Sequence, residues 1–303
     1  MSWERGAGRP ATVGVLGAGR MGLPIARQLV GAGFHTIAYR RGAGDELRAA
    51  GARVAGSVAE LCVGAEVVIS LLPSADAVHA VLPELVRGLR PGSVLVDMAT
   101  LGLAVKKQVR DALEPRGVAM LDCPISGGPM MIPRRENVVL GSGEPDAFEH
   151  ARPPLESFSA NVLYLGVFGT GSRVKFIAQQ LVAVHNLAAA EALRYAMRSG
   201  IDANTVIAAI VPSIASSRFF EQRAPMMVER RFSPALGPIG MLAKDLPPVL
   251  DDADEIGVAM PLLRTAQRYY AAALEAGMGE LDVAAMIDAL ELDGAALQHE
   301  VNR

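Results

Sequence analysis

The sequence predicts an α/β protein in which a doubly wound N-terminal domain is followed by an all-α C-terminal domain. The chain has 303 residues, more than a single hydrophobic core usually holds. In its first half, continuous apolar runs alternate with amphipathic stretches, which is typical of a largely parallel sheet covered by helices on both faces. After Gly166 the character changes, and from Arg173 to Arg198 the chain has no proline and is rich in alanine and leucine. This stretch predicts a long helix that joins the two domains.

We therefore expect a flexible tail at residues 1–11, an α/β domain at residues 12–167 and a helical domain at residues 168–303. In the helical domain we expect helices broken by prolines, because proline lacks the amide that a helix interior needs. The long helix is apolar around most of its circumference, so we expect it to be buried between domains or subunits and to support a homodimer or a higher homo-oligomer. The apolar runs that predict strands are Thr12–Leu16, Thr36–Tyr39, Val67–Leu72, Ser93–Asp97, Val138–Leu140 and Val162–Leu165. The prolines expected to break helices are Pro212, Pro225, Pro234, Pro238, Pro247, Pro248 and Pro261.

The composition points to small-molecule chemistry. The formal net charge is −3, and no long basic stripe is present, so neither nucleic acid nor a membrane surface is an expected partner. The first residues lack the apolar core of a signal peptide, and no run is long and apolar enough to span a bilayer, which predicts a cytoplasmic protein. Cys62 and Cys123 lie among apolar neighbours and are predicted to be buried thiols. The five histidines show no metal-binding spacing, so we expect no metal.

The first predicted strand runs directly into a glycine-rich turn and then into a helix. Gly17 provides the sharp exit from the strand, Gly19 lets the backbone approach a pyrophosphate, and Gly22 lets helix and strand pack closely. Apolar residues at strand and helix spacing flank the turn, so the pattern is more specific than three glycines alone. It predicts a Rossmann domain that binds a dinucleotide, with Arg20 and Met21 beside the glycines in the pyrophosphate-binding turn.

The second predicted strand ends in Arg40 and Arg41. An NAD-binding domain usually has an acidic residue there, about 20 residues after the glycines, to bind the ribose hydroxyls. A guanidinium instead suits the 2′-phosphate of NADP, which it can bind with two parallel charge-assisted hydrogen bonds. The sequence therefore favours NADP(H) over NAD(H), the alternative being an ordinary solvated surface. Asp45 and Glu46 are predicted to be first-turn acids of the next helix.

Four further segments follow predicted strands or open the long helix, where ligands bind in open α/β sheets. They are Leu72-Pro73-Ser74, Asp97-Met98-Ala99-Thr100, Asp122-Cys123-Pro124-Ile125-Ser126-Gly127-Gly128-Pro129 and Gly169-Thr170-Gly171-Ser172-Arg173-Val174-Lys175. Together with the glycine turn they resemble the β-hydroxyacid dehydrogenase family, which contains 3-hydroxyisobutyrate dehydrogenases and tartronate semialdehyde reductases. The resemblance extends from Thr12 to about Leu290.

The resemblance implies roles for individual residues. Lys175 would be the general acid/base, and Gln179, four residues later on the same helical face, would supply the amide that contacts substrate. Ser126, Gly127 and Gly128 would hold the substrate carboxylate. The nicotinamide half of the cofactor would be held by Leu72, Pro73 and Thr100, with Lys244 of the segment Lys244-Asp245-Leu246 approaching its nicotinamide end.

Elementary chemistry supports the same role for Lys175. Carbonyl reduction needs a hydride on carbon and a proton on oxygen, and an ammonium group beside that oxygen both supplies the proton and stabilises the developing charge. The chain has four lysines, Lys106, Lys107, Lys175 and Lys244, and the neighbours of Lys175 are apolar. A solvated surface lysine is the usual alternative.

This chain departs from the family pattern at several points. Ala178 and Ala99 replace an asparagine and a serine, and residues 129–137 form a bulkier, more basic loop. Arg134 or Arg135 could bind a second anionic group of a larger substrate while Met130, Met131 and Ile132 line an apolar pocket. Alternatively, the loop is a solvent-facing basic turn with its methionines packed on the domain.

The predicted function is NADP-dependent interconversion of a small β-hydroxyacid and its semialdehyde or keto form. One alternative is an NADPH-dependent reductase of C=N bonds similar to the imine reductases, although these usually have aspartate or tyrosine in place of Lys175. The other is a non-catalytic NADPH-binding sensor.

Overall fold

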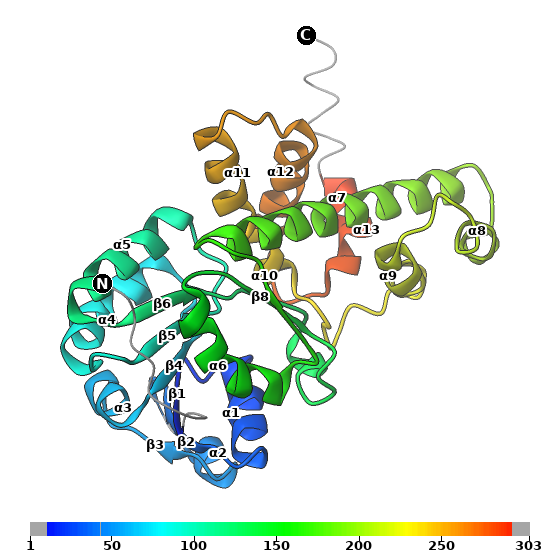
Figure 1. Cartoon of the computed structure of the whole chain (residues 1–303). Coiled ribbons are helices and arrows are strands. Elements are labelled where there is room, and N and C mark those ends of the chain that lie inside the picture. The colour runs from blue at the N-terminus through cyan, green and yellow to red at the C-terminus, as the bar shows by residue number, and fades with distance from the viewer. Residues whose placement is uncertain (1–10, 43, 293–303) are drawn as a thin grey trace. The chain divides into compact units, whose positions relative to one another are not determined.

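The computed structural model describes residues 11–42 and 44–292. The chain forms two compact units, residues 1–175 and 176–303, whose elements are shown in Figure 1. The tail predicted at residues 1–11 lies, apart from Ala11, outside the described residues. In the described part of the chain, no helix combines the length and apolar character needed to cross a membrane.

The first unit contains a six-stranded parallel sheet with the strand order β3-β2-β1-β4-β5-β6. The chain starts in the middle of the sheet at β1, builds outward to β3 and then returns to build the other half, so the predicted doubly wound topology is confirmed. The strands are β1 (Thr12–Leu16), β2 (His35–Tyr39), β3 (Arg53–Val54), β4 (Val67–Ser70), β5 (Val94–Asp97) and β6 (Ala119–Asp122).

Helices cover both faces of this sheet, and each face has its own core. Val67 and Ile69 pack in one core, whereas Val68 packs in the other, because successive side chains of a strand point to opposite faces. This explains why the strand sequences are apolar throughout. Figure 1 shows α1 and α6 on one side of the strands and α3, α4 and α5 on the other. The helices are α1 (Gly22–Gly31), α2 (Asp45–Ala49), α3 (Val58–Gly64), α4 (Ala75–Gly88), α5 (Leu103–Leu113) and α6 (Pro145–Phe158), with short 3₁₀ turns η1 (Glu114–Arg116) and η2 (Pro129–Met131).

A second, three-stranded sheet follows in the same unit. β7 (Ile125–Ser126) pairs antiparallel with β8 (Val138–Gly141), and β8 pairs parallel with β9 (Asn161–Tyr164). The runs at 138–140 and 162–165 were expected to join the main sheet, and that expectation is wrong. Both are too short to specify which sheet they enter, and in β9 Leu163 and Tyr164 are exposed.

The regular structure of the second unit is helical over its described residues, as predicted. Its first helix, α7 (Thr170–Arg198), begins in the first unit and is continuous across the boundary. Pro225 lies inside α9 instead of breaking it, whereas Pro247, Pro248 and Pro261 occupy first-turn positions, where the missing amide has no helical partner to lose. The other helices are α8 (Ala203–Ile210), α9 (Arg218–Val228), α10 (Ile239–Ala243), α11 (Leu246–Glu255), α12 (Pro261–Glu275), the 3₁₀ turn η3 (Val283–Ala285) and α13 (Met286–Leu292).

Helix α7 has one buried and one exposed side. Ala183 and Ala190 are fully buried, whereas Ile177, Leu181 and Tyr195 are 54%, 48% and 74% exposed. Among the described residues, the long helix is therefore not buried around most of its circumference, because its apolar residues lie on more faces than those residues cover.

Candidate functional site

The carboxyl ends of the central strands lie side by side at one edge of the main sheet. Leu16 is in register with Ser70, Ser70 with Asp97, and Asp97 with Asp122, while Tyr39 pairs with Leu16 on the other side. The loops that follow these residues carry most of the predicted cofactor contacts. Because ligands of open α/β sheets bind outside this edge, the fold places those loops where a dinucleotide would lie.

The glycine turn has the geometry that the fingerprint predicts. Gly17 has φ +90°, and a Cβ on it would lie 2.8 Å from the carbonyl oxygen of Leu71. A Cβ on Gly22 would lie 2.6 Å from the carbonyl oxygen of Gly17, whereas a Cβ on Gly19 would meet nothing within 4 Å. Gly17 and Gly22 thus permit close packing, while Gly19 leaves open space beside the backbone.

Helix α1 starts directly after this turn. Its N-cap residue, Met21, provides no side-chain hydrogen bond to the first turn, and Arg20 is exposed. Amides at a helix N-terminus attract phosphate when no side chain caps them. The turn and the helix start fit the pyrophosphate of a dinucleotide.

The two arginines after β2 differ in their surroundings. Arg40 is half-buried and forms an ion pair with Glu46 of α2, with 3.1 Å between Nη1 and Oε2; Arg41 is exposed. Asp45 and Glu46 occupy the first turn of α2, as predicted. Arg40 is a suitable anion ligand, but it already has a carboxylate partner that a 2′-phosphate would have to displace or share.

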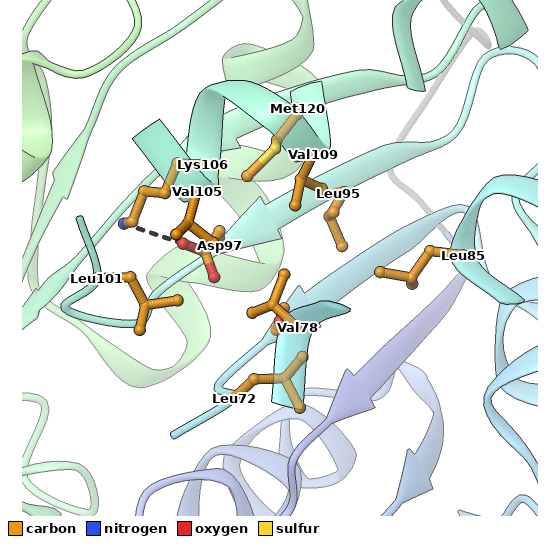
Figure 2. A pocket seen from close by; sticks show the side chains of 11 residues that line it. Leu72, Val78, Leu85, Leu95, Asp97, Leu101, Val105, Lys106, Val109 and Met120 are labelled. Carbon is orange, nitrogen blue, oxygen red and sulfur yellow. Dashed lines mark ion pairs between the residues drawn. The ribbon is translucent and has the colours of Figure 1, made fainter. Parts of the chain in front are cut away.

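The predicted nicotinamide contacts follow β4 and β5. Leu72 is only 9% exposed and lines a small pocket with Val78, as Figure 2 shows. Leu72 is therefore largely covered and has little surface left to contact a cofactor. Pro73 is exposed and Thr100 half-buried.

The substrate segment begins in β7, where Ser126 pairs with Val138. Gly127 has φ +129°, and a Cβ there would lie 3.1 Å from both the Met131 sulfur and the Asn137 Cβ. This position therefore favours glycine for its backbone conformation and leaves little space for a side chain. Gly128, the N-cap of η2, is extended, with φ −95° and ψ 171°.

The loop after Gly128 packs against α1 and α6 of the first unit. Ile132 is fully buried in the core that includes α1, so the interpretation of this side chain as a pocket wall is wrong. The Gln28 side-chain amide donates to the Pro133 carbonyl at 3.2 Å, and Arg135 donates to the Glu156 carbonyl at 2.7 Å. Met130, by contrast, is 70% exposed.

A buried ion cluster lies at the carboxyl ends of β5 and β6. The sequence interpretation missed this cluster. Lys106, on α5, is 1% exposed; its Nζ lies 2.9 Å from Asp97 Oδ2 and 2.7 Å from Asp122 Oδ1. Figure 2 shows its ion pair with Asp97. Burial alone would lower the pKa of Lys106, but the two carboxylates outweigh burial and raise it. Two aspartates that end adjacent buried strands are the sequence signal that could have revealed the cluster.

The start of α7 packs closely against β6 and β8. A Cβ on Gly171 would lie 2.1 Å from the Leu140 carbonyl oxygen and 2.8 Å from the Asp122 carbonyl oxygen. Lys175 follows one turn later and is 8% exposed, so the alternative of a solvated surface lysine is wrong. Close packing at Gly171 therefore sets the starting point of the helix that carries Lys175.

In the second unit, the structure brings two predicted residues to a common partner. Gln179 Nε2 donates to Asp245 Oδ2, and Lys244 Nζ donates to Asp245 Oδ1 at 2.9 Å. Asp245 is 4% exposed and had no role assigned in the sequence interpretation. Gln179 is also buried, whereas Lys244 is exposed.

The two buried cysteines are free thiols, as predicted. Burial raises the pKa of Cys62 to about 12, so this thiol is a poor nucleophile and a poor metal ligand. Among the residues that the structure describes, no three His, Cys, Asp or Glu side chains gather as a metal site.

Known proteins match the chain over nearly its whole length. Residues 12–166 match the family of the NAD-binding domain of 6-phosphogluconate dehydrogenase, and residues 169–290 match that described as NAD-binding of NADP-dependent 3-hydroxyisobutyrate dehydrogenase. The L-threonate dehydrogenase of Cupriavidus necator is 33% identical, with 94% of this chain and 98% of that protein covered. The NAD-dependent L-serine dehydrogenase of Pseudomonas aeruginosa is 28% identical, with 89% and 94% covered.

The solved structure of Mycobacterium tuberculosis 3-hydroxyisobutyrate dehydrogenase with L-serine superimposes with a TM-score of 0.86 at 27% identity, covering 92% of this chain and 99% of that one. Family matches, full-length relatives and fold agree with the resemblance seen in the motifs. The chain belongs to the β-hydroxyacid dehydrogenase family of NAD(P)-dependent oxidoreductases.

Proposed function

We propose that this enzyme interconverts a small β-hydroxyacid and its semialdehyde or keto form with NADP(H), using Lys175 as the general acid and base. The observation that carries the proposal is the burial of Lys175 one turn into α7, whose first turn packs against the carboxyl end of β6. Lysine side chains are mostly exposed. A lysine that is buried close to the carboxyl ends of the strands therefore favours a role in the site over a role at the surface.

Bound nicotinamide would exchange a hydride with the substrate carbon. In the reducing direction, Lys175 would donate a proton to the carbonyl oxygen and stabilise the charge that develops there; in the oxidising direction it would accept the hydroxyl proton. The proton-transferring group must lie within hydrogen-bonding reach of that oxygen. The Lys175 side chain would therefore determine which carbon–oxygen bond reacts.

The substrate is expected to carry a carboxylate. The hydroxyl of Ser126 and the amides of Gly127 and Gly128 offer donors of the kind that bind carboxylate oxygens, and the positive φ of Gly127 supports an amide arrangement that ordinary residues rarely adopt. Gln179 would add an amide contact. Its Nε2 donates one hydrogen bond to Asp245, and its carbonyl oxygen would accept from a substrate hydroxyl.

The preference for NADP(H) rests on Arg40 and Arg41 at the end of β2. A guanidinium matches a phosphate in charge and geometry, and no carboxylate precedes it at the strand end. The Glu46 side of the Arg40–Glu46 ion pair is exposed, and exposed ion pairs contribute little to stability. A 2′-phosphate could therefore replace Glu46 as the partner of Arg40. The pyrophosphate would lie on Gly17–Gly22.

A second copy of the chain is the proposed partner for the exposed side of α7. Ile177, Leu181 and Tyr195 present large apolar side chains on this helix, a surface of the kind that interfaces cover. Light scattering during gel filtration would test this directly. A dimer that Leu181→Glu converts to a monomer supports the proposal, and a wild-type monomer refutes it.

The proposed activity is tested by cofactor binding followed by turnover. NADPH and NADH are titrated into wild type, and oxidation of the tighter-binding cofactor is then followed with small aldehydes, ketoacids and cyclic imines. Lys175→Ala should lower kcat by about 10²-fold to 10⁴-fold with little change in cofactor affinity. Lys107→Ala, which removes a lysine from α5, is the matched control and should retain turnover.

Retained turnover in Lys175→Ala would refute the proposed acid/base. Reduction of imines but not of carbonyl compounds would support an imine reductase instead. Cofactor binding without turnover of any substrate would point to the NADPH sensor.

A further inference from the structure

The buried cluster around Lys106 connects the strand ends to the start of α7. We propose that Asp122 and Lys106 are positioning residues: together they fix the first turn of α7 and thereby the place of Lys175. The inference deepens the proposed function and rests on its assignment of Lys175.

The carboxylate of Asp122 is the centre of the cluster. Its Oδ1 accepts from Lys106 Nζ at 2.7 Å and from Ser172 Oγ at 2.7 Å. Its Oδ2 accepts from the Ser172 amide at 2.8 Å and from Ser142 Oγ at 3.2 Å. Ser142 Oγ in turn accepts from the Gly171 amide at 3.0 Å. Two successive amides of the first turn of α7 are therefore held by side chains from β6 and the residue after β8.

This arrangement replaces an ordinary helix cap. The first amides of a helix have no partner within it and are usually satisfied by the side chain of the residue just before it. Here the acceptor is a carboxylate from a strand 50 residues earlier, and negative charge at a helix N-terminus is electrostatically favourable. The position of α7 along its axis is thus tied to the end of β6.

Lys106 makes this buried carboxylate possible. Asp122 is completely buried, and an unpaired charge would be very costly there. The ammonium group of Lys106 lies within ion-pairing distance of both Asp122 and Asp97 and offsets part of their negative charge. Burial raises the pKa of Asp97, an effect that Lys106 partly offsets. Loss of Lys106 would leave two carboxylates facing each other in the core.

The cluster also reaches the proposed cofactor contacts. Asp97 ends β5 and precedes Thr100 by three residues. On the other side, Ser172 precedes Lys175 by three residues, about 4.5 Å along a helix axis. A shift at Ser172 would therefore move the lysine expected to transfer the proton, whereas Thr100 follows the opposite end of the cluster.

The test uses graded variants of the full-length protein. Ser172→Ala removes one hydrogen bond to Asp122, whereas Asp122→Asn removes the charge at nearly constant shape. Ser172→Thr keeps the hydroxyl and serves as the conservative variant, and Lys107→Met is the control for removing a lysine from α5. For each variant we would measure kcat and KM, the pH profile of kcat, NADPH affinity, and hydrogen exchange of residues 170–176 without cofactor.

Ser172→Ala and Asp122→Asn should lower kcat by about 10-fold to 100-fold, since small misplacements of a reacting group cost this much. They should also shift the pH profile of kcat and speed exchange at residues 170–176, with NADPH affinity changed less than about twofold. Lys107→Met should resemble wild type, and Ser172→Thr, which keeps the hydroxyl, should retain more activity than Ser172→Ala.

Folded Ser172→Ala with unchanged kcat, pH profile and exchange would overturn the inference. A loss of kcat only in parallel with lost NADPH binding would also overturn it, because the cluster would then serve the stability of the whole unit. Should Lys175→Ala keep its turnover, the proposed function fails, while the exchange of residues 170–176 still reports separately whether Asp122 anchors α7.

Discussion

Gly171→Ala is the substitution for which the structure predicts the clearest effect. The added Cβ would lie 2.1 Å from the Leu140 carbonyl oxygen and 2.8 Å from the Asp122 carbonyl oxygen, whereas ordinary van der Waals contact begins near 3.4 Å. Both atoms are backbone atoms of paired strands and cannot rotate away. The helix must therefore move off the sheet or the strands must yield.

The expected cost follows from two opposing terms. Overpacking a rigid site lowers the free energy of unfolding by up to about 3 kcal/mol. Replacing glycine by alanine in a helix raises it by up to about 1 kcal/mol. The net destabilisation of about 2 kcal/mol corresponds to a melting temperature lower by about 4–8 °C for a unit of this size. Because Lys175 follows on the same helix, kcat should also fall.

Thermal unfolding by circular dichroism and steady-state kinetics check this prediction. Gly31→Ala at the end of α1 is the matched control, since a Cβ there meets nothing within 4 Å; it should leave the melting temperature unchanged or raise it slightly. If Gly171→Ala melts like Gly31→Ala and keeps its kcat, the close packing of α7 against the sheet is wrong.

Three further predictions concern other parts of the first unit. Glu46→Gln removes the partner of Arg40 and should strengthen NADPH binding about 2-fold to 5-fold relative to NADH, by less than about 1 kcal/mol; equal changes in both affinities would argue against Arg40 as the phosphate ligand. Cys62 and Cys123 are buried and should react with a thiol reagent only after unfolding, so labelling of the native protein would contradict their burial. Burial lowers the pKa of His150 below its ordinary 6.5; the neutral ring therefore contributes stability that is complete above pH 6.5 and declines as the pH falls through that value. His150→Gln should lose less stability than wild type between about pH 7 and about pH 5 in urea titrations, and an unchanged dependence would exclude His150 as its source.

The motifs at the strand ends could be predicted from the sequence because the residues of each motif are close together in the chain. Gly17, Gly19 and Gly22 lie within six residues, and the strand and helix periodicities on either side follow from backbone geometry alone. Likewise, the fully apolar strands predicted a sheet covered on both faces. These inferences needed no knowledge of distant contacts.

Partnerships between distant residues could not be predicted in this way. Lys106 and Lys107 are adjacent on one helix and look equivalent in the sequence, yet only Lys106 turns into the core. Its burial depends on Asp97 and Asp122, which become neighbours only when β5 pairs with β6. The same holds for Asp245, which acquires its contact with Gln179 across 66 residues.

By itself, the sequence determined the α/β and helical halves of the chain, the glycine turn and the family-specific motifs, because hydrophobic periodicity and turn chemistry act over a few residues. Only the tertiary structure decided that a second small sheet forms, that Leu72 faces the core, and that a buried carboxylate anchors α7. These features arise from packing and charge pairing between segments far apart in the chain, where the free energy of a buried group depends on which partner the fold brings to it.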